Sequence, residues 1–216
     1  AIIRASGRKI GLWQRSTMQE SISAPQVGGI VKLTGFILKT SLIIEMIGAA
    51  LLAPVFCNDL GIAKGLWYSL FHSISAFCNA GFDLFGIREP FSSLTFYHSN
   101  IYLNIIIMLL IITGGIGFLV WGDIRTHKHR IRRFSLQSKV VLMTSAVLIV
   151  LPALYFFFYE YDCETIHDRT IHSLFQSVTT RTAGFNTTDL AAMDESGTAI
   201  MIILMLIGGS PGSTAG

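Results

Sequence analysis

Two short apolar stretches, each followed by the same Ala-Gly-Phe turn, decide how this sequence folds. They read LWYSLFHSISAFCNAGFD over residues 66–83 and IHSLFQSVTTRTAGFNT over residues 171–187. Their apolar parts, Leu66–Phe77 and Ile171–Thr180, are twelve and ten residues long. Helices of that length cannot cross a hydrocarbon core of about 30 Å, and they are typical of re-entrant segments that enter a membrane and turn back.

The composition around these stretches points to a membrane. The chain has 216 residues, of which 51% are hydrophobic and 13% are charged, with a net charge of +3 and a mean hydropathy of +0.58. The charged fraction is about half that of a soluble globular domain, which excludes an ordinary soluble protein. High hydropathy with low net charge also excludes a disordered chain. We therefore expect an all-α, polytopic membrane protein.

Four further apolar runs surround the two stretches. Three of them have about twenty residues, which is enough for a helix to cross the bilayer core. The fourth is too short to cross by itself. The runs are Phe36–Phe56, Asn100–Trp121, Val140–Phe158 and Thr198–Ile207.

The charges between these runs predict the orientation of the chain. Residues 1–39 and 122–139 hold twelve basic residues and two acids, whereas residues 57–99 and 159–196 hold four basic residues and ten acids. Lys and Arg near the ends of spans mark the cytoplasmic side. The first two segments are therefore expected to face the cytoplasm, and the acidic segments to face outside.

The two stretches belong to an internal repeat. Around each one the order is a span, an outward loop, a short apolar helix, the Ala-Gly-Phe turn, a polar stretch and another span, so two copies of one unit are the simplest interpretation. The matched residues are Phe71-His72-Ser73 with Phe175-Gln176-Ser177, and Ala80-Gly81-Phe82 with Ala183-Gly184-Phe185, with one residue of slippage between them.

This repeat divides the chain into four parts. They are a cytoplasmic linker over 1–35, a first pore-loop repeat over 36–121, a basic cytoplasmic loop over 122–136 and a second repeat over 137–216. The chain begins without Met and stops inside a glycine-rich region, so we expect it to be a piece of a longer polypeptide whose pore is incomplete here.

The Ala-Gly-Phe turns have a composition that suits a permeating cation. Irregular backbone is tolerated at membrane depth where protein covers it or where it lines a watery cavity. Glycine reaches dihedral angles that let carbonyl oxygens face a shared axis, where they replace the water shell of an alkali ion. The negative C-terminal end of the preceding short helix favours the same cation. Such a site needs no charged ligand.

Three motifs together resemble a known family. FCNAGFD (Phe77–Asp83), TTRTAGFNT (Thr179–Thr187) and the terminal GGSPGSTAG (Gly208–Gly216) are similar to the second and third selectivity-filter loops and the intramembrane gating loop of the Trk/Ktr/HKT superfamily of cation transporters. The resemblance covers essentially the whole chain and is strongest to the bacterial Ktr membrane subunit. Members have four such repeats around one pore, of which this chain carries the second and third.

The resemblance implies a function and a set of site residues. It implies passive potassium uptake by a pore-forming subunit of the cell membrane, with no covalent step, and a terminal loop that obstructs the pore when closed. Four glycines, two serines and a proline in nine residues cannot continue a stable helix there. The implied filter residues are Cys78, Asn79, Ala80, Gly81, Thr182, Ala183 and Gly184, with Arg181 one step deeper, and the implied gate residues are Gly208, Gly209, Ser210, Gly212, Ser213 and Gly216.

The resemblance also implies partners. It implies a homodimer of pore subunits in the lipid bilayer and a cytosolic ring of RCK-type nucleotide-binding subunits that docks on 1–35 and 122–139, whereas no nucleic acid is expected. The residues implied for this contact are Arg125, Arg130, Arg132 and Arg133. The alternative for this cluster is a positive-inside anchor that touches anionic lipid headgroups. Potassium at the filter is the expected metal ion, without a transition metal or cofactor, and Na⁺ is a candidate activator.

Other classes of protein are disfavoured by the same residues. An intramembrane enzyme needs a nucleophile with a base, or two acids, within its spans, and Glu45 is the single acid there. A non-conducting scaffold leaves the two matched turns unexplained, whereas a sodium-selective relative stays open because the first-repeat filter is absent. Glu45 itself either borders the ion path or pairs inside the bundle.

Two smaller sets of residues have structural interpretations. Gly114-Gly115-Ile116-Gly117 predicts a close-packing face for a neighbouring helix rather than a nucleotide site. Three cysteines predict no disulfide framework; Cys57 and Cys163 fall on the same side of the membrane, and we expect them to be unpaired.

Overall fold

We describe the protein from a computed structural model, which places residue 17 and residues 30–90, 92–128, 130–161 and 165–215. Most of the linker predicted over 1–35, together with Cys163 and Gly216, lies outside these residues. The elements within them are helices, as the sequence predicted, and no strand occurs in this described part of the chain.

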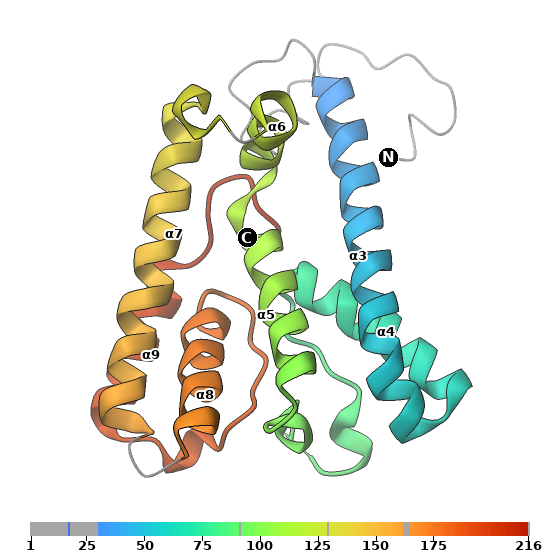
Figure 1. Ribbon diagram of the computed structural model, residues 1–216, viewed down its shortest axis with the longest axis vertical. Coiled ribbons are helices and arrows are strands. Elements are labelled where there is room, and N and C mark those ends of the chain that lie inside the picture. The colour runs from blue at the N-terminus through green and yellow to red at the C-terminus, as the bar shows by residue number, and fades with distance from the viewer. Residues whose placement is uncertain (1–16, 18–29, 91, 129, 162–164, 216) are drawn as a thin grey trace.

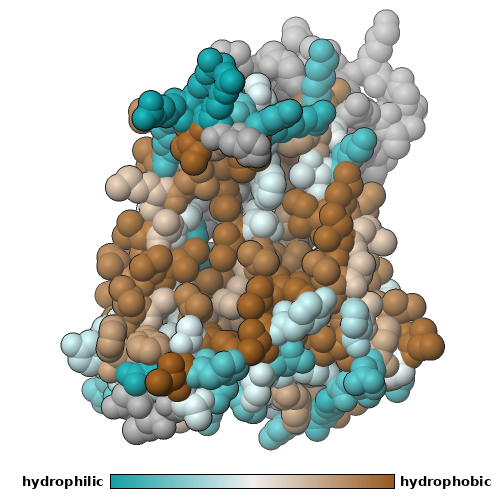
Figure 2. Space-filling view, viewed as in Figure 1, coloured by the Kyte–Doolittle hydropathy of each residue, from teal (hydrophilic) through white to brown (hydrophobic). Residues whose placement is uncertain are grey.

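Three helices stand side by side (Figure 1). They are α3 (Ile30–Leu60), α5 (Ile101–Ile116) and α7 (Leu136–Tyr155), the last continued by a π-helical turn to Glu160. The segments Val31–Leu60 and Leu136–Glu160 are each long and apolar enough to cross a membrane. Figure 2 shows the matching surface, in which a broad apolar band separates two hydrophilic ends.

Two short helices, α4 (Ile62–Phe77) and α8 (Ile166–Thr179), occupy the half of the molecule that is predicted to face outward, at the bottom of Figure 1. Each packs back onto the long helix that precedes it, α4 on α3 and α8 on α7. Both begin four or five residues before the apolar stretches predicted from sequence. For α8 the reason is a local cap, because the Thr165 hydroxyl accepts a hydrogen bond from the Asp168 amide and so starts the helix in a polar segment.

The run expected as one span over Asn100–Trp121 is broken in the structure. Helix α5 ends at Ile116, and α6 (Phe118–His127) leaves it at an angle of 92°. Gly117 makes the bend with a φ of +96°, which a residue with a side chain rarely adopts. The freed Phe118 amide donates to Gly212 of the terminal loop at 2.9 Å. A segment distant in sequence therefore stabilises the break.

The last helix is α9 (Glu195–Ile207), which has thirteen residues and is too short to cross alone, as predicted. Gly208 ends it with a φ of +69°, and the chain then runs back into the middle of the molecule beside α5 (Figure 1).

The buried core joins the two repeats. An aromatic cluster fills the space between α3, α4 and the outward loop, with ring centroids of Phe56 and His72 5.3 Å apart and those of His72 and Phe85 4.9 Å apart. Phe185, from the second turn, lies at the edge of the same cluster, 6.4 Å from His72. The two turns are thus held on one core rather than on two.

Candidate functional site

The two Ala-Gly-Phe turns share an unusual backbone. In the first, Asn79 has a φ of +50° and Gly81 of +69°; in the second, Thr182 has a φ of +68° and Gly184 of +80°. In both turns, therefore, a residue with positive φ is followed by an alanine with negative φ and then by a glycine with positive φ. The repeat inferred from sequence extends to the conformation of the main chain.

The hydrogen bonds that hold the turns also correspond. In each turn, one serine or threonine near the end of the short helix makes two hydrogen bonds. Its backbone carbonyl accepts a bond from the alanine amide, and its side-chain hydroxyl donates to the phenylalanine carbonyl. The alanine lies five positions after the hydroxyl residue in the first turn and four positions after it in the second. The one-residue offset between the two sequence repeats therefore falls within this segment. The pairs are Ala80 with Ser75 (2.9 Å) and Ala183 with Thr179 (3.0 Å) for the amides, and Ser75 with Phe82 (2.7 Å) and Thr179 with Phe185 (2.6 Å) for the hydroxyls.

The turns touch each other. A Cβ atom added to Gly81 would lie 2.4 Å from the Ala183 carbonyl oxygen, a distance that real Cβ atoms do not reach. A Cβ atom added to Gly184 would lie 3.6 Å from the Gly81 Cα atom, an ordinary contact. The first turn thus needs glycine for space as well as for conformation, and the backbones of the two turns meet at this point.

A serine on each short helix fixes its depth against the preceding long helix. The Ser73 hydroxyl donates to the Glu45 carbonyl of α3, and the Ser177 hydroxyl donates to the Ile149 carbonyl of α7, both at 2.6 Å. The α7 helix holds Pro152, which cannot supply the amide that the Leu148 carbonyl would otherwise accept, and Ser177 lies 3.3 Å from that oxygen as well. The serines belong to the matched triplets of the sequence repeat.

The residues directly before Asn79 and Thr182 differ between the repeats. The Cys78 thiol lies 4.0 Å from the Glu45 carboxylate of α3. Arg181 is 7% exposed, and its guanidinium donates to the Ser145 hydroxyl of α7 at 3.1 Å. Glu45 therefore stands behind the first turn, beside the predicted filter residue Cys78.

The terminal loop lies against both turns. The Thr214 hydroxyl donates to the carbonyl of Phe77, the last residue of α4, at 2.6 Å, and the Thr214 amide donates to the Gly114 carbonyl at 3.3 Å. The Thr182 hydroxyl of the second turn donates to the Ala215 carbonyl at 3.2 Å. Of the predicted gate residues, Gly208 adjoins the filter, since a Cβ atom there would lie 3.6 Å from the Thr182 side chain. Ser210 and Gly212 instead bond to Gly115 and Phe118 at the α5–α6 bend, and Gly209 and Ser213 pack against each other within the loop.

Gly114 makes this convergence possible. A Cβ atom at this position would lie 1.9 Å from the Phe77 carbonyl oxygen and 2.7 Å from the Thr214 hydroxyl. The close packing predicted for the glycine run is thus found at Gly114, against the end of α4 and the terminal loop. Gly117, in the same run, instead bends the chain.

Thr182 carries backbone strain at the centre of the site. A β-branched residue at a φ of +68° is an outlier, with a typical cost of about 1–3 kcal/mol, and it persists where its surroundings hold it in place. Here the surroundings are the contact with Ala215 and the bonds that anchor the second turn. Strain of this kind clusters at functional sites.

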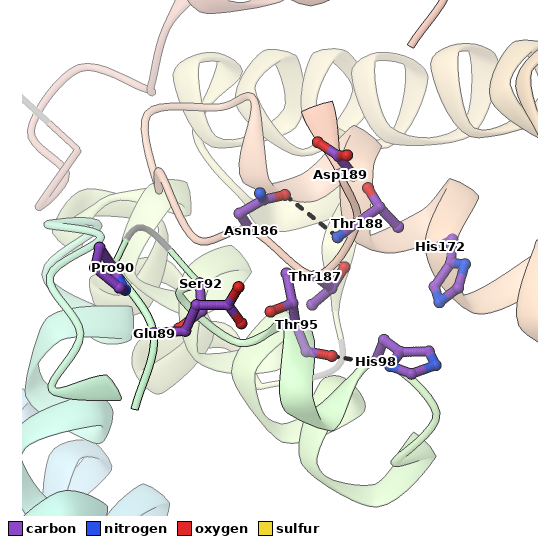
Figure 3. A pocket seen from close by; sticks show the side chains of 10 residues that line it. All are labelled: Glu89, Pro90, Ser92, Thr95, His98, His172, Asn186, Thr187, Thr188 and Asp189. Carbon is purple, nitrogen blue, oxygen red and sulfur yellow. Dashed lines mark hydrogen bonds between the residues drawn. The ribbon is translucent and has the colours of Figure 1, made fainter. Parts of the chain in front are cut away.

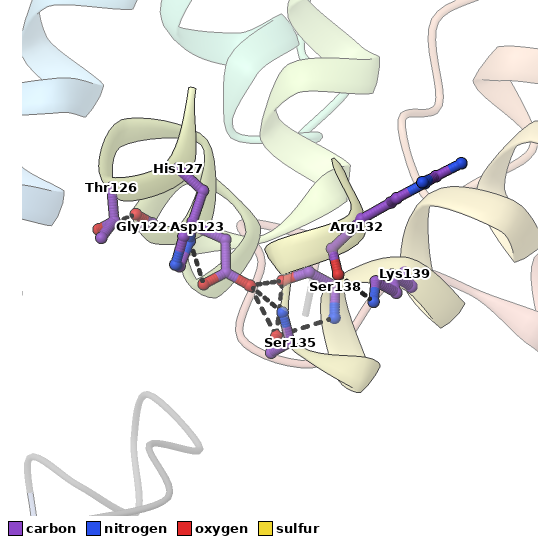
Figure 4. A network of polar contacts seen from close by, with 8 residues as sticks. All are labelled: Gly122, Asp123, Thr126, His127, Arg132, Ser135, Ser138 and Lys139. Atoms are coloured by element: carbon purple, nitrogen blue, oxygen red, sulfur yellow. Dashed lines mark hydrogen bonds and ion pairs between the residues drawn. The ribbon is translucent and has the colours of Figure 1, made fainter. Parts of the chain in front are cut away.

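The arginines predicted as a partner contact lie at the opposite end of the molecule, which is predicted to face the cytoplasm. All four are exposed. The Arg125 guanidinium sits 5.0 Å above the Phe36 ring and so links α6 to α3. The nearby Asp123 carboxylate accepts hydrogen bonds from Ser138 on α7 and from Ser135, the residue directly before that helix (Figure 4). The structure therefore does not bring these arginines to the filter.

A polar hollow of about 530 Å³ opens on the outward side, beside the second turn (Figure 3). The residues that follow this turn meet the loop of the first repeat there, since the Leu94 amide donates to the Asn186 carbonyl at 2.8 Å and the Asn186 amide donates to the Ser93 hydroxyl at 3.1 Å. These bonds join the outward loops of the two repeats.

A second outward cluster ties α3 to the loop before α5. Arg88 pairs with Asp59 at 2.8 Å, and the Tyr97 hydroxyl donates to the same carboxylate. Burial and this hydrogen bond raise the pKa of the Tyr97 phenol. The cluster holds the outward end of the first repeat closed around its aromatic core.

Sequence reasoning missed several residues of the site. Thr214 and Gly117 are invisible to local patterns because their partners lie far along the chain. Ser73 and Ser177 carried a signal, since they are the third residue of each matched triplet, but a triplet match does not state what its serine contacts.

The chain matches the family model of the cation transport protein TrkH over residues 2–216. It is 40% identical to the potassium/sodium uptake protein NtpJ of Enterococcus hirae over 97% of its own length and 46% of that protein. It is 38% identical to Ktr system potassium uptake protein B of Bacillus subtilis, over 99% of its length and 48% of that protein. The chain thus spans about half the length of these relatives.

The fold has a counterpart among solved structures. The crystal structure of the potassium transporter TrkH from Vibrio parahaemolyticus aligns with a TM-score of 0.71 at 16% identity, covering 94% of this chain and 41% of the other. At that identity the likeness establishes the fold alone.

Proposed function

The chain belongs to the TrkH family of cation transport proteins, and on this premise we propose that it forms part of a potassium uptake pore in the cell membrane. The observation that carries the proposal is the pair of matched turns, whose left-handed backbones meet at Gly81 and Ala183 within an apolar, helical protein. The names of the relatives NtpJ and Ktr protein B, which refer to potassium uptake, support the choice of ion.

In this proposal the backbone carbonyls of the two turns replace water around a dehydrated potassium ion. The C-terminal ends of α4 and α8 stop at the turns, so their negative ends favour a cation at the same place. No charged ligand is required, and the ion moves down its electrochemical gradient. The residues that we assign to this filter are Asn79, Ala80, Gly81, Thr182, Ala183 and Gly184, with Cys78 and Arg181 deeper.

We assign the role of a gate to the terminal loop, residues 208–216. Its bonds through Thr214 and Thr182 hold it against both turns, and conduction requires it to move away. A loop of glycines and serines can make such a movement because it has no helix to unwind.

The assembly around the pore is also a proposal. The two repeats, 36–121 and 137–216, serve as the second and third of four, and two pore subunits form a dimer in the bilayer. A cytosolic ring of nucleotide-binding subunits docks on the inward loops, where Arg132 is the first residue to test because its side chain points away from the neighbouring contacts (Figure 4). Na⁺ remains a proposed activator.

The filter assignment is tested by three matched alanine substitutions in the full-length protein. Gly81→Ala is expected to abolish potassium uptake in cells that lack other uptake systems, because its Cβ would collide with the other turn. Gly184→Ala has space and faces only the cost of a left-handed alanine, about 1–2 kcal/mol, so partial uptake should remain. Gly86→Ala, in an open outward loop, is the control and should leave uptake unchanged.

Flux measured in reconstituted vesicles separates the alternatives. Potassium flux above sodium flux supports the proposal, and equal or greater sodium flux would favour a sodium-conducting relative, an option that the name of NtpJ keeps open. Normal, potassium-selective flux in Gly81→Ala would show that the turns are not the filter.

A further inference from the structure

A basic hollow lies at the inward end of the molecule, far from the two turns. It has a volume of about 400 Å³ and is formed where α6 ends and the chain turns toward α7. Its lining side chains are Thr126, His127, Lys128, Arg130 and Arg133. Neither the filter nor the terminal loop uses any of them.

The positive charge of this hollow is not neutralised by the acid beside it. One oxygen of Asp123 accepts hydrogen bonds from the Ser135 amide and hydroxyl and from the Ser138 hydroxyl, at 2.6–2.9 Å (Figure 4). Its other oxygen lies 3.9 Å from His127. Among the residues that the structure describes, Lys128, Arg130 and Arg133 form no ion pair, so they are available to an anion from outside.

Apolar side chains stand next to these charges. Ile131 is 62% exposed and Leu136 is 79% exposed, and both flank Arg133 in the sequence. Bare aliphatic side chains beside arginines, at the cytoplasmic end of a membrane protein, are typical of a segment at the boundary between lipid headgroups and acyl chains.

One local effect opposes anion binding. The C-terminal end of α6 reaches the hollow, and a helix end of this kind carries about half a negative charge. Two carbonyls of its last turn are satisfied within the chain, since the Lys128 amide donates to the Ile124 carbonyl and the Arg130 amide donates to the His127 carbonyl. Three cationic side chains, Lys128, Arg130 and Arg133, outweigh both this half charge and the single negative charge of Asp123, so the net charge around the hollow is positive.

We propose that this hollow binds the phosphate of an anionic phospholipid from the inner leaflet. Arg130 and Arg133 hold the phosphate oxygens, Lys128 and Thr126 complete the headgroup site, and the acyl chains lie toward Ile131 and Leu136. The inference rests on the placement of the chain in a membrane and not on the ion that it conducts. Its test therefore uses lipid binding rather than flux.

The experiment measures binding of phosphatidylglycerol to the purified full-length protein by native mass spectrometry after reconstitution in phosphatidylcholine. Arg130→Gln and Arg133→Gln are each expected to raise the dissociation constant about fivefold, the usual effect of one basic residue near an anionic headgroup. Arg132→Gln is the matched control, because it removes the same charge from the same turn but does not line the hollow. Arg130→Lys and Arg133→Lys keep the charge and should keep most of the binding, which separates charge loss from misfolding.

Several outcomes would overturn the proposal. Equal losses in all three glutamine variants would mean diffuse attraction to a basic surface, and unchanged binding in Arg130→Gln and Arg133→Gln would mean that the hollow is not used. Displacement of the lipid by inorganic phosphate, with phosphate bound alone, would assign the site to a free anion. If Arg130→Gln and Arg133→Gln lost the binding of a cytosolic regulatory protein but kept the binding of lipid, the hollow would be assigned to that protein.

Discussion

Thr182 joins the strained second turn to the terminal loop through one hydroxyl. Thr182→Val keeps the branched shape and the left-handed strain but removes the bond to the Ala215 carbonyl. A hydrogen bond of this kind contributes about 0.5–1.5 kcal/mol, so the closed position of the loop should lose that amount. If the loop is the gate, we expect basal potassium flux to rise about two- to tenfold.

Thr182→Ser is the control for this residue, because it keeps the hydroxyl and relieves the branched side chain. Flux in vesicles that contain each full-length variant is compared per folded protein. Unchanged flux in Thr182→Val, with folding intact, would mean that the bond to Ala215 does not hold the pore closed.

At the scale of elements, the bend between α5 and α6 depends on Gly117. An alanine there would have to adopt a φ of +96°, and its Cβ would lie 3.1 Å from the Pro211 carbonyl oxygen. We expect Gly117→Ala to lower the free energy of unfolding by about 1–2 kcal/mol or more, because a left-handed alanine is strained and the terminal loop must shift.

Gly122→Ala, one turn further along α6, is the matched comparison. Its Cβ would meet open space, and alanine is the better helix former by about 1 kcal/mol, so this variant should be neutral or stabilised. Thermal unfolding of the two purified variants measures the difference. Equal stability would contradict the role of Gly117 as the residue that bends the chain.

At the scale of the whole molecule, the placement of charges and the apolar band predict which end faces the cytoplasm. Ile87 is 89% exposed at the outward end, and Arg132 is exposed at the inward end. In the full-length protein, Ile87→Cys should react with a membrane-impermeant maleimide in intact cells, whereas Arg132→Cys should react only after the cells are opened. The labelling of the parent protein is subtracted, and the reverse pattern would invert the topology.

Much of this molecule follows from its sequence alone. Apolar lengths predict which helices can cross a membrane and which, such as α4 and α8, are expected to turn back. Lys and Arg counts predict the orientation of the chain, and the recurrence of Ala-Gly-Phe after two short helices marks the turns. These features are local, so each can be recognised without knowing where the rest of the chain goes.

Tertiary structure alone decided how these parts meet. The break at Gly117, the contact of Gly81 with Ala183, and the bond from Thr214 to Phe77, which joins residues 137 positions apart, follow no period in the sequence. The physical reason is that irregular backbone inside a membrane must find partners for its amides and carbonyls, and any segment brought near by folding can supply them. Composition predicts that such partners are needed, and only the packed chain determines which residues they are.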